Sequence, residues 1–241
     1  MAVMVVRAEP PAVSPAESIR FASGARQTAL VELYTSEGCS SCPPAERWLA
    51  ELRDEPGLWH DFVPVAFHVN YWDNLGWPDR FASRQFTQRQ YALADSWGGG
   101  SVYTPCFVRD GAEWHPSSAP VTSDKIAGLL AVNYDPASGH CSVKFLRPEK
   151  SPGSYEVHAA LLGGGLSSNV TAGENEGETL PHEFVVLVLV DAPMQSDGVA
   201  ATAELTLPQP ETKNTARRAL AAWVTRRGEL APLQATGGWV H

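Results

Sequence analysis

Short apolar runs alternate with segments of helical spacing over the first half of the chain. Apolar runs rich in β-branched and aromatic residues predict buried strands, and the segments between them, bounded by proline and glycine, predict helices. The Asp110-Gly111 dipeptide predicts a hairpin after the third strand. The predicted elements are a strand from 28 to 35, a helix from 39 to 53, a strand from 62 to 69, a helix from 80 to 96, a strand from 102 to 108 and a helix from 122 to 132.

Beyond residue 136 the pattern changes to short runs that alternate or are apolar throughout, separated by proline, glycine and asparagine. This pattern of short strands and turns predicts an antiparallel β-sandwich. The strands expected there are 141–147, 155–162, 184–190, 200–207, 219–226 and 230–234. We therefore expect a flexible leader over residues 1–27, an α/β domain over residues 28–136 and a β-sandwich-like domain over residues 137–241.

Charge and hydropathy narrow the classes of partner. The 241 residues include 18 Lys and Arg against 27 Asp and Glu, for a net charge of −9. This balance, with no basic run and no basic aromatic strip, argues against nucleic acid as a partner. No stretch of about 18 apolar residues exists, so no transmembrane segment is expected. Residues 1–27 also lack the basic start and long apolar core of a complete signal peptide.

Candidate chemistry is concentrated in Cys39-Ser40-Ser41-Cys42, directly after the first predicted strand. Because Pro43 and Pro44 are tolerated only in the first turn of a helix, the spacing predicts that Cys39 opens the helix. The unpaired backbone N–H groups and the helix dipole there favour a thiolate, so the pKa of Cys39 is expected to fall below that of a free cysteine. Cys42 lies close enough to resolve a mixed disulfide at Cys39. The pair is therefore predicted to be redox-active.

A CxxC motif can also bind zinc or form an inert disulfide. A tetrahedral zinc site of this type needs a second cysteine pair, and Cys106 and Cys141 stand alone in the sequence. An inert buried disulfide is the other alternative. The combination of strand, turn, CxxC and helix favours the redox interpretation, and neither a metal nor another cofactor is expected.

The order of elements, with the dithiol after the first strand and a Thr-Pro at the start of the third, is typical of a thioredoxin-like fold. The predicted fold class is an α/β thioredoxin-like domain followed by an all-β antiparallel sandwich-like domain. Residues 33–45, 67–77, 101–105 and 173–182 also resemble the DUF1223 family, thioredoxin-like proteins of unknown function of which many are predicted to be exported. The resemblance implies a periplasmic or secreted protein. A cytoplasmic location is the alternative, because no complete signal peptide is present.

The resemblance also implies a role for Thr104 and Pro105. In thioredoxin-like proteins the proline that faces the CxxC motif is cis, which exposes the backbone of the preceding residue to a bound peptide. We therefore expect a cis Thr104-Pro105 bond and substrate binding at these two residues. The family commonly has Gln where this chain has Cys106 and Asp where it has Asn70. The first departure adds a thiol near the site, and the second puts an acid/base role for that loop position in doubt.

Four further residues are possible auxiliaries of the dithiol. Cys106 has the strand parity of Thr104 and can face the dithiol, although a free cysteine also packs well as a small apolar residue. His68, at the end of a strand, is either a proton carrier or a hydrogen-bonded core residue. Trp72 and Trp77 either line an apolar wall beside the dithiol or pack under the helix that follows them.

The predicted function is that of a thiol–disulfide oxidoreductase acting on protein or small-molecule thiols and disulfides. Cys39 would attack and Cys42 would resolve. The alternative is a non-enzymatic binding module with a static disulfide, or with Cys39, Cys42 and Cys106 holding copper(I). The acidic loop over residues 173–178 lacks the spacing of a calcium loop and is predicted to be solvated.

Overall fold

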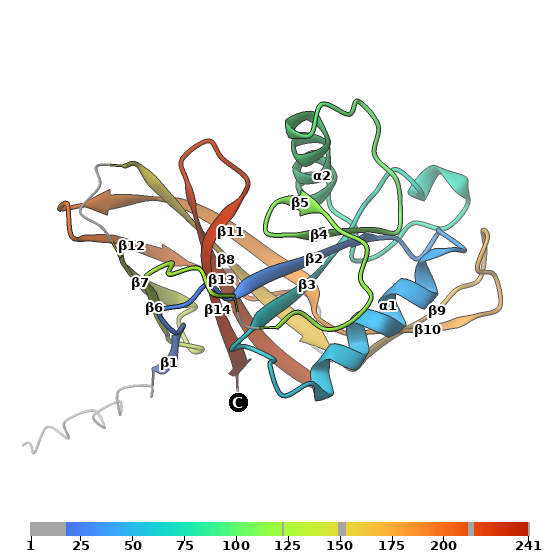
Figure 1. Ribbon diagram of the computed structural model, residues 1–241. Coiled ribbons are helices and arrows are strands. Elements are labelled where there is room, and N and C mark those ends of the chain that lie inside the picture. Colours follow the sequence, from blue (N-terminus) through green and yellow to red (C-terminus); the bar gives the residue numbers. More distant parts are fainter. Residues whose placement is uncertain (1–17, 122, 149–152, 212–214, 241) are drawn as a thin grey trace, which may run out of the picture.

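The computed structural model describes residues 18–121, 123–148, 153–211 and 215–240, and strands dominate it (Figure 1). The helices are α1 (Cys42–Glu51) and α2 (Arg84–Ser96), with short 3-10 turns η1 (Leu52–Asp54) and η2 (Asp73–Leu75). The strands are β1 (Ile19–Ala22), β2 (Ala29–Thr35), β3 (Phe62–His68), β4 (Cys106–Arg109), β5 (Ala112–Glu113), β6 (Leu129–Tyr134), β7 (His140–Leu146), β8 (Tyr155–Gly164), β9 (Leu166–Asn169), β10 (Thr179–His182), β11 (Val185–Ser196), β12 (Ala200–Thr206), β13 (Arg217–Arg226) and β14 (Pro232–Val240).

The predicted fold class is wrong, because the two halves of the chain build one mixed sheet of 12 strands. Strand β11 lies parallel to β3 at its start, antiparallel to β12 at its end and antiparallel to β8 along its other edge. The chain is therefore not an α/β thioredoxin-like domain followed by a separate β-sandwich. A continuous apolar run predicts a buried strand but does not identify its neighbours in the sheet, which is why this junction was missed. The domain limits at residues 27 and 136 stay a prediction.

Two predictions of local structure also differ from the observed structure. The helix expected over residues 122–132 is absent from the described part, 123–132. Instead, β6 runs from Leu129 to Tyr134, and its buried residues alternate with more exposed ones, which is the period of a strand. Part of the expected leader, β1, pairs antiparallel with β6, while residues 1–17 lie outside the described residues. Strands β7, β8, β12 and β13 and helix α2 lie close to their predicted positions.

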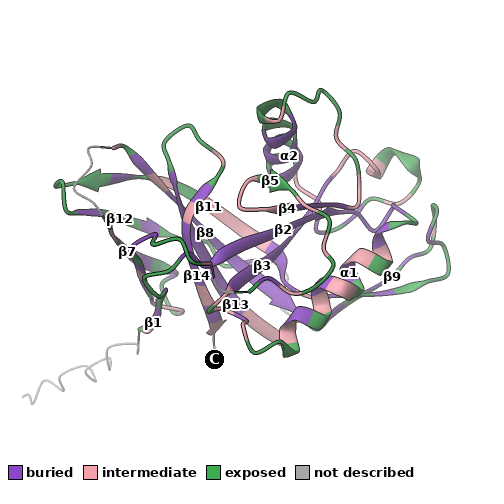
Figure 2. Ribbon diagram, viewed as in Figure 1, coloured by how far each residue is buried: buried purple, intermediate pink, exposed green. Residues whose placement is uncertain are grey.

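Strands β2 and β3 form the parallel centre of the first core. All seven residues of each strand are buried (Figure 2), and their register pairs Ala29 with Phe62 and Thr35 with His68. Burial on both faces explains why both strands are apolar nearly throughout. Helices α1 and α2 cover opposite faces of this pair (Figure 1). The carboxyl ends of β2 and β3 therefore meet at one edge, directly before the turn that carries the CxxC motif.

A second apolar core lies among β6, β7, β12, β8 and β13. Residues of β13 alternate between the two cores: Ala221 and Trp223 belong to the first, and Ala222 and Val224 to the second. Period-two alternation of this kind means that β13 is buried on both faces and separates the two cores. Within the described ranges, no helix is long and apolar enough to cross a membrane.

A buried ion pair ties α2 to the sheet. The guanidinium of Arg89 donates to both carboxylate oxygens of Glu32 on β2, at 2.8 and 3.0 Å, and Tyr34 Oη donates to the same carboxylate at 2.8 Å. Arg89 also lies over the rings of Phe67 and Trp223, which extends the contact to β3 and β13. Although burial opposes protonation, the Glu32 carboxylate raises the pKa of Arg89 above its ordinary value, so Arg89 stays protonated.

Replacement of Arg89 by Met should lower the free energy of unfolding by about 3–5 kcal/mol, because Glu32 would remain buried without its cationic partner. Urea unfolding followed by circular dichroism measures the change. Arg26→Met is the matched control, since Arg26 pairs with Asp124 at the surface and should contribute far less. Equal losses in the two variants would show that the buried pair has no special structural role.

Candidate functional site

Cys39 and Cys42 form a disulfide in the turn between β2 and α1, with their Cα atoms 5.4 Å apart. Helix α1 begins at Cys42 with Ser41 at its N-cap, so Cys39 precedes the helix and does not open it as predicted. The two prolines after Cys42 occupy the first turn, where their missing N–H groups have no helical partner to lose. Both cysteines have 0% exposure, so the disulfide is fully buried in this conformation.

Trp72 connects the disulfide turn to Thr104 and Pro105. Its indole Nε1 donates to Thr104 Oγ1 at 2.8 Å, directly before the cis Thr104-Pro105 bond. On its other side, a Cβ added to Gly38 would lie only 3.1 Å from Trp72 Cβ, so the backbone before Cys39 approaches the tryptophan closely. The structure thus brings together Cys39, Trp72, Thr104 and Pro105, which come from three separate segments. Trp72 therefore contacts both Thr104 and the backbone before Cys39, and its role in the site stays a prediction.

The acidic loop at residues 173–178 binds the disulfide turn. Asn175 is buried, and its Nδ2 donates to the backbone carbonyls of Glu37 and Cys39 at 2.8 and 3.0 Å. The Glu174 carboxylate accepts from both the backbone N–H and the hydroxyl of Ser40, at 3.0 and 2.7 Å. These bonds hold the loop, which connects β9 to β10, against the CxxC turn. The glutamates of the loop are exposed, as expected of a solvated loop, and the hydrogen bonds to the CxxC turn are an additional finding.

A cluster of buried acidic and histidine side chains adjoins the disulfide turn. His182 Nδ1 lies 2.5 Å from Glu46 Oε2, and His182 Nε2 lies 3.2 Å from Glu37 Oε1. His68 Nδ1 lies 2.6 Å from Asp79 Oδ2, and the rings of His68 and His182 meet edge to face at 5.2 Å. All five residues are 8% exposed or less. We call Glu37, Glu46, His68, Asp79 and His182 the buried ionic cluster.

Sequence position explains how the cluster reaches the disulfide. Glu37 lies two residues before Cys39, and Glu46 lies one helical turn after Cys42 on the same side of α1. His68 ends β3, next to Thr35 at the end of β2. These positions are at the carboxyl ends of parallel strands, where α/β arrangements commonly place binding groups.

The ion pairs shift the protonation of the cluster. Burial opposes protonation of His182, but the carboxylates of Glu37 and Glu46 raise its pKa to about 9. Burial would raise the pKa of Glu46, yet its hydrogen bond with His182 lowers it below the usual value. In the same way Asp79 outweighs burial and raises the pKa of His68, while His68 lowers the pKa of Asp79. These shifts favour the ionised forms of the His182–Glu46 and His68–Asp79 pairs.

The remaining predicted residues have different surroundings. Trp77 Nε1 donates to Glu37 Oε2 at 2.6 Å, so Trp77 positions a member of the cluster. His68 is hydrogen-bonded in the core, as its structural alternative predicted. Cys106 is a free, buried thiol packed in the first core, and burial raises its pKa to about 11. Cys141 is a second free thiol in the other core, so no bridge joins it to Cys106.

Sequence reasoning missed most of the cluster and the loop contacts. The functional candidates that it did not identify are Glu37, Glu46, Asp79, Glu174, Asn175 and His182. Three of them, Glu174, Asn175 and His182, lie in the segment from 173 to 182 that already resembled a family pattern. The signal for Glu46 was its spacing of four residues from Cys42. Nothing local in the sequence connects His182 to His68.

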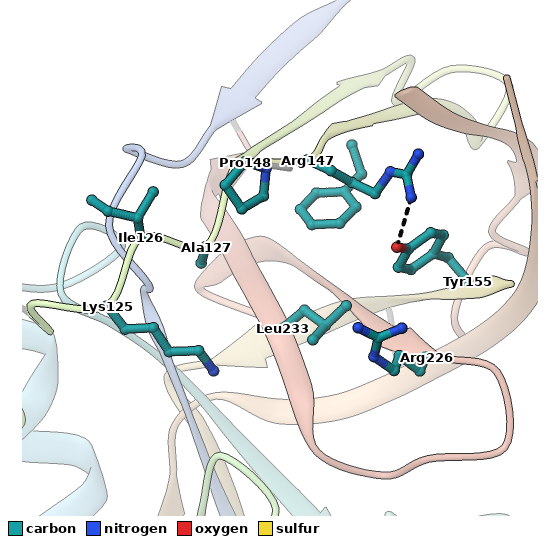
Figure 3. A pocket seen from close by; sticks show the side chains of 9 residues that line it. Lys125, Ile126, Ala127, Arg147, Pro148, Tyr155, Arg226 and Leu233 are labelled. Carbon is teal, nitrogen blue, oxygen red and sulfur yellow. Dashed lines mark hydrogen bonds between the residues drawn. The ribbon is translucent and has the colours of Figure 1, made fainter. Parts of the chain in front are cut away.

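A second concave region is separate from the disulfide. A pocket of about 340 Å³ is lined by Lys125, Arg147, Tyr155, Arg226 and Leu233, among others (Figure 3). Arg147 Nη1 donates to Tyr155 Oη at 3.1 Å across its wall. Tyr155 belongs to the second core, so this pocket opens beside the other half of the sheet.

The chain resembles known proteins over most of its length. The model of the family described as protein of unknown function (DUF1223) matches residues 30–225. A crystal structure of a protein from Agrobacterium tumefaciens is 23% identical, with 87% of this chain and 92% of that chain covered and a TM-score of 0.59. HBP35 of Porphyromonas gingivalis is 14% identical, with 90% and 76% covered and a TM-score of 0.60. At these identities the two structures show a shared fold alone. Among curated proteins, none matches the chain.

Replacement of Asn175 by Ala should speed reduction of the disulfide by dithiothreitol by about tenfold or more. The change removes two hydrogen bonds of about 1 kcal/mol each, and each 1.4 kcal/mol changes an opening equilibrium about tenfold. Quenched alkylation and mass spectrometry follow the reaction.

Asn169→Ala is the matched control on the same hairpin, because its side chain meets only the exposed Thr179 hydroxyl in the described contacts. An unchanged reduction rate in Asn175→Ala would show that the loop does not limit access to the disulfide.

Proposed function

The chain belongs to the DUF1223 family, whose function is unknown, and we propose that it is a thiol–disulfide oxidoreductase acting through Cys39 and Cys42. The observation that carries the proposal is the disulfide between these two residues, in a turn at the ends of two parallel strands. Cysteines three positions apart suit exchange, because either thiolate can attack a disulfide formed by the other.

The proposed reaction is a balanced two-electron exchange. A substrate thiolate attacks the sulfur of Cys39, the bond to Cys42 breaks, and Cys42 leaves as a thiolate that takes up a proton. A second substrate thiol then displaces Cys39, so two substrate thiols become one disulfide and the protein becomes a dithiol. In the reverse direction Cys39 attacks a substrate disulfide, and Cys42 resolves the mixed disulfide. The substrate class is a protein or small-molecule thiol or disulfide.

The disulfide is buried, so a substrate cannot reach it without a change in the surrounding structure. With both cysteines at 0% exposure, a substrate thiol reaches Cys39 only after the neighbouring chain moves. The loop that carries Glu174 and Asn175 is a suitable moving part. Glu174 is exposed, and β9 and β10 form a two-stranded sheet that is not hydrogen-bonded to the large sheet. Opening would leave Trp72, Thr104 and Pro105 as the proposed contact positions for the substrate.

The second candidate is a binding module with a static disulfide, and the complete burial of Cys39 and Cys42 is what favours it. In that case the disulfide would only fix the turn before α1, and its removal would lower stability without any loss of an exchange activity. A copper(I) site on Cys39, Cys42 and Cys106 is a weaker form of this candidate, because the first two sulfurs are already bonded to each other.

We propose export to the periplasm or beyond, on the resemblance of the chain to exported family members. A persistent disulfide fits an oxidising compartment, whereas thiols in the cytosol are kept reduced.

Wild-type protein should catalyse reduction of insulin disulfides by dithiothreitol, and Cys39→Ser should abolish this catalysis. Cys42→Ser should instead accumulate a mixed disulfide with substrate, because the resolving thiol is missing. Cys141→Ser is the matched control, since this buried cysteine lies in the second core. A wild-type disulfide that resists glutathione and dithiothreitol under native conditions would favour the static alternative and remove the enzyme proposal.

Modulation by Cys106 stays a prediction and can be tested in the same assay. Cys106→Ser should shift the glutathione equilibrium of the Cys39–Cys42 pair while leaving the fold intact. An unchanged equilibrium would assign Cys106 to the core alone, where its buried thiol already packs.

A further inference from the structure

The pocket beside the second core gathers cations in an acidic protein. Lys125, Arg147 and Arg226 line it, and no described aspartate or glutamate does (Figure 3). The whole chain has 27 Asp and Glu against 18 Lys and Arg, so the charge of the pocket is opposite to that of the protein. Within the described ranges, none of the three cations has an ion pair. A concave region lined by one sign of charge attracts ions of the other sign.

Arg147 has one edge of its guanidinium without an acceptor. Its Nη1 donates to Tyr155 Oη at 3.1 Å, but its Nε and Nη2 atoms are buried and have no hydrogen bond. Arg89 uses the same two atoms to bind both carboxylate oxygens of Glu32, at 2.8 and 3.0 Å. The free edge of Arg147 therefore suits a bidentate carboxylate, which the described part of the chain does not supply.

Arg147 has to turn before a ligand reaches this edge, because both atoms are covered from solvent. Its Cζ lies 5.3 Å from the centroid of the Tyr155 ring, and rotation about the outer bonds of the side chain can bring the edge into the pocket that the residue lines. The rotation gives up one hydrogen bond to a neutral hydroxyl. A bound carboxylate replaces it with two hydrogen bonds to ionised oxygens, so binding favours the turned side chain.

The rest of the pocket is mostly apolar. The rings of Phe145 and Tyr155 meet edge to face at 5.8 Å, and Leu233 packs against the second core, to which both rings belong. Ala127 and Pro148 extend the apolar lining. The volume of about 340 Å³ is near the lower limit of the range of about 300–1,000 Å³ for small-molecule sites, so the ligand is small. An apolar body on the ligand would remove this lining from water.

We propose that this pocket binds a small organic acid, with one carboxylate on an alkyl or aryl body. Lys125 and Arg226, which are exposed, attract the acid, and the turned Arg147 binds its carboxylate through Nε and Nη2. The apolar lining covers the body. The pocket shares no residue with the disulfide turn or the buried ionic cluster, so this proposal goes beyond the proposed exchange reaction and does not depend on it.

Isothermal titration calorimetry of the full chain with octanoate tests the proposal, with the disulfide kept oxidised. We expect a Kd of about 1 mM or lower. Octanamide keeps the apolar body without the charge, whereas acetate and inorganic phosphate keep a charge without the body. Each of these three compounds should bind at least about tenfold more weakly, because the pocket recognises both parts of the acid.

Substitutions assign the cations. Arg147→Gln should weaken octanoate binding at least about tenfold, because the bidentate pair is lost. Arg226→Gln should weaken it about two- to fivefold, as expected for an exposed charge. The matched control Arg227→Gln removes a charge from the next residue, which does not line the pocket, and should change the Kd by less than about twofold.

Nitrogen-15 NMR of the wild-type protein reports on the carboxylate directly. The Nε–H signal of Arg147, identified by its loss in Arg147→Gln, should move when octanoate is added, because Nε gains an acceptor. A signal that stays in place at saturation would overturn the assignment of the carboxylate to this edge.

Other outcomes would overturn the proposal as a whole. They are octanoate binding weaker than a Kd of about 1 mM, octanamide or phosphate that binds as tightly as octanoate, and an Arg147→Gln variant with wild-type affinity. The comparison of octanoate with octanamide uses only wild-type protein, so it decides the question even if a variant fails to fold.

Discussion

The structure depends on two strands that are buried on both faces. In β8 and β13, neighbouring residues alternate between two apolar cores, as Ala159 and Ala160 do in one strand and Leu220 and Ala221 in the other. Because the side-chain period of a strand is two, a slip of one residue would exchange every side chain between the cores. Small residues dominate these positions, so both cores can approach the strands closely. The pair thus fixes the relative positions of the first and second halves of the sheet.

The geometry of the candidate site depends on these two strands, because β8 positions β11. Strand β11 pairs with β8 along most of its length, and its first residue, Val185, lies beside Ala66 of β3. The backbone N–H of Ala66 donates to the carbonyl oxygen of Phe184 at 2.8 Å. Phe184 has a positive φ of 56°, which turns the chain between β10 and β11. His182 is thereby carried to His68, although 114 positions separate them in the numbering of the chain. A local turn and a strand pairing assemble the cluster.

Local patterns predicted much of the secondary structure. Alternation and apolar runs identified β7, β8, β12 and β13, and the prolines after Cys42 marked the first turn of α1. They did not predict the pairing of β3 with β11, because periodicity reports which face is buried and not which strand lies beside it. The helix expected over residues 122–132 failed for a related reason. The four apolar residues from Leu129 to Val132 fit a strand once β1 and β7 supply its partners.

Some site residues could be predicted from local sequence patterns, and others depend on contacts between distant segments. Cys39, Cys42, Thr104 and Pro105 belong to short motifs whose chemistry can be read locally, and so they were predicted. The buried ionic cluster cannot be read in this way, because a lone glutamate or histidine in an apolar segment has no distinctive spacing. Its members come together only when three separate segments converge and place the carboxylates beside the imidazoles.

Contacts between the two halves of the chain limit where the protein can be divided. Asn175 and His182 come from beyond residue 136, yet they hold the backbone of Cys39 and the side chain of Glu46. A fragment that ends near residue 136 would therefore lose the loop against the disulfide turn and one of the two histidines of the buried ionic cluster. Glu46 would then lose its imidazole partner and keep only the hydrogen bond from Thr35 Oγ1, so its carboxylate would favour an open, hydrated α1 terminus over burial. The disulfide turn and the second half of the chain are thus joined by direct hydrogen bonds, whatever the stability of each half alone.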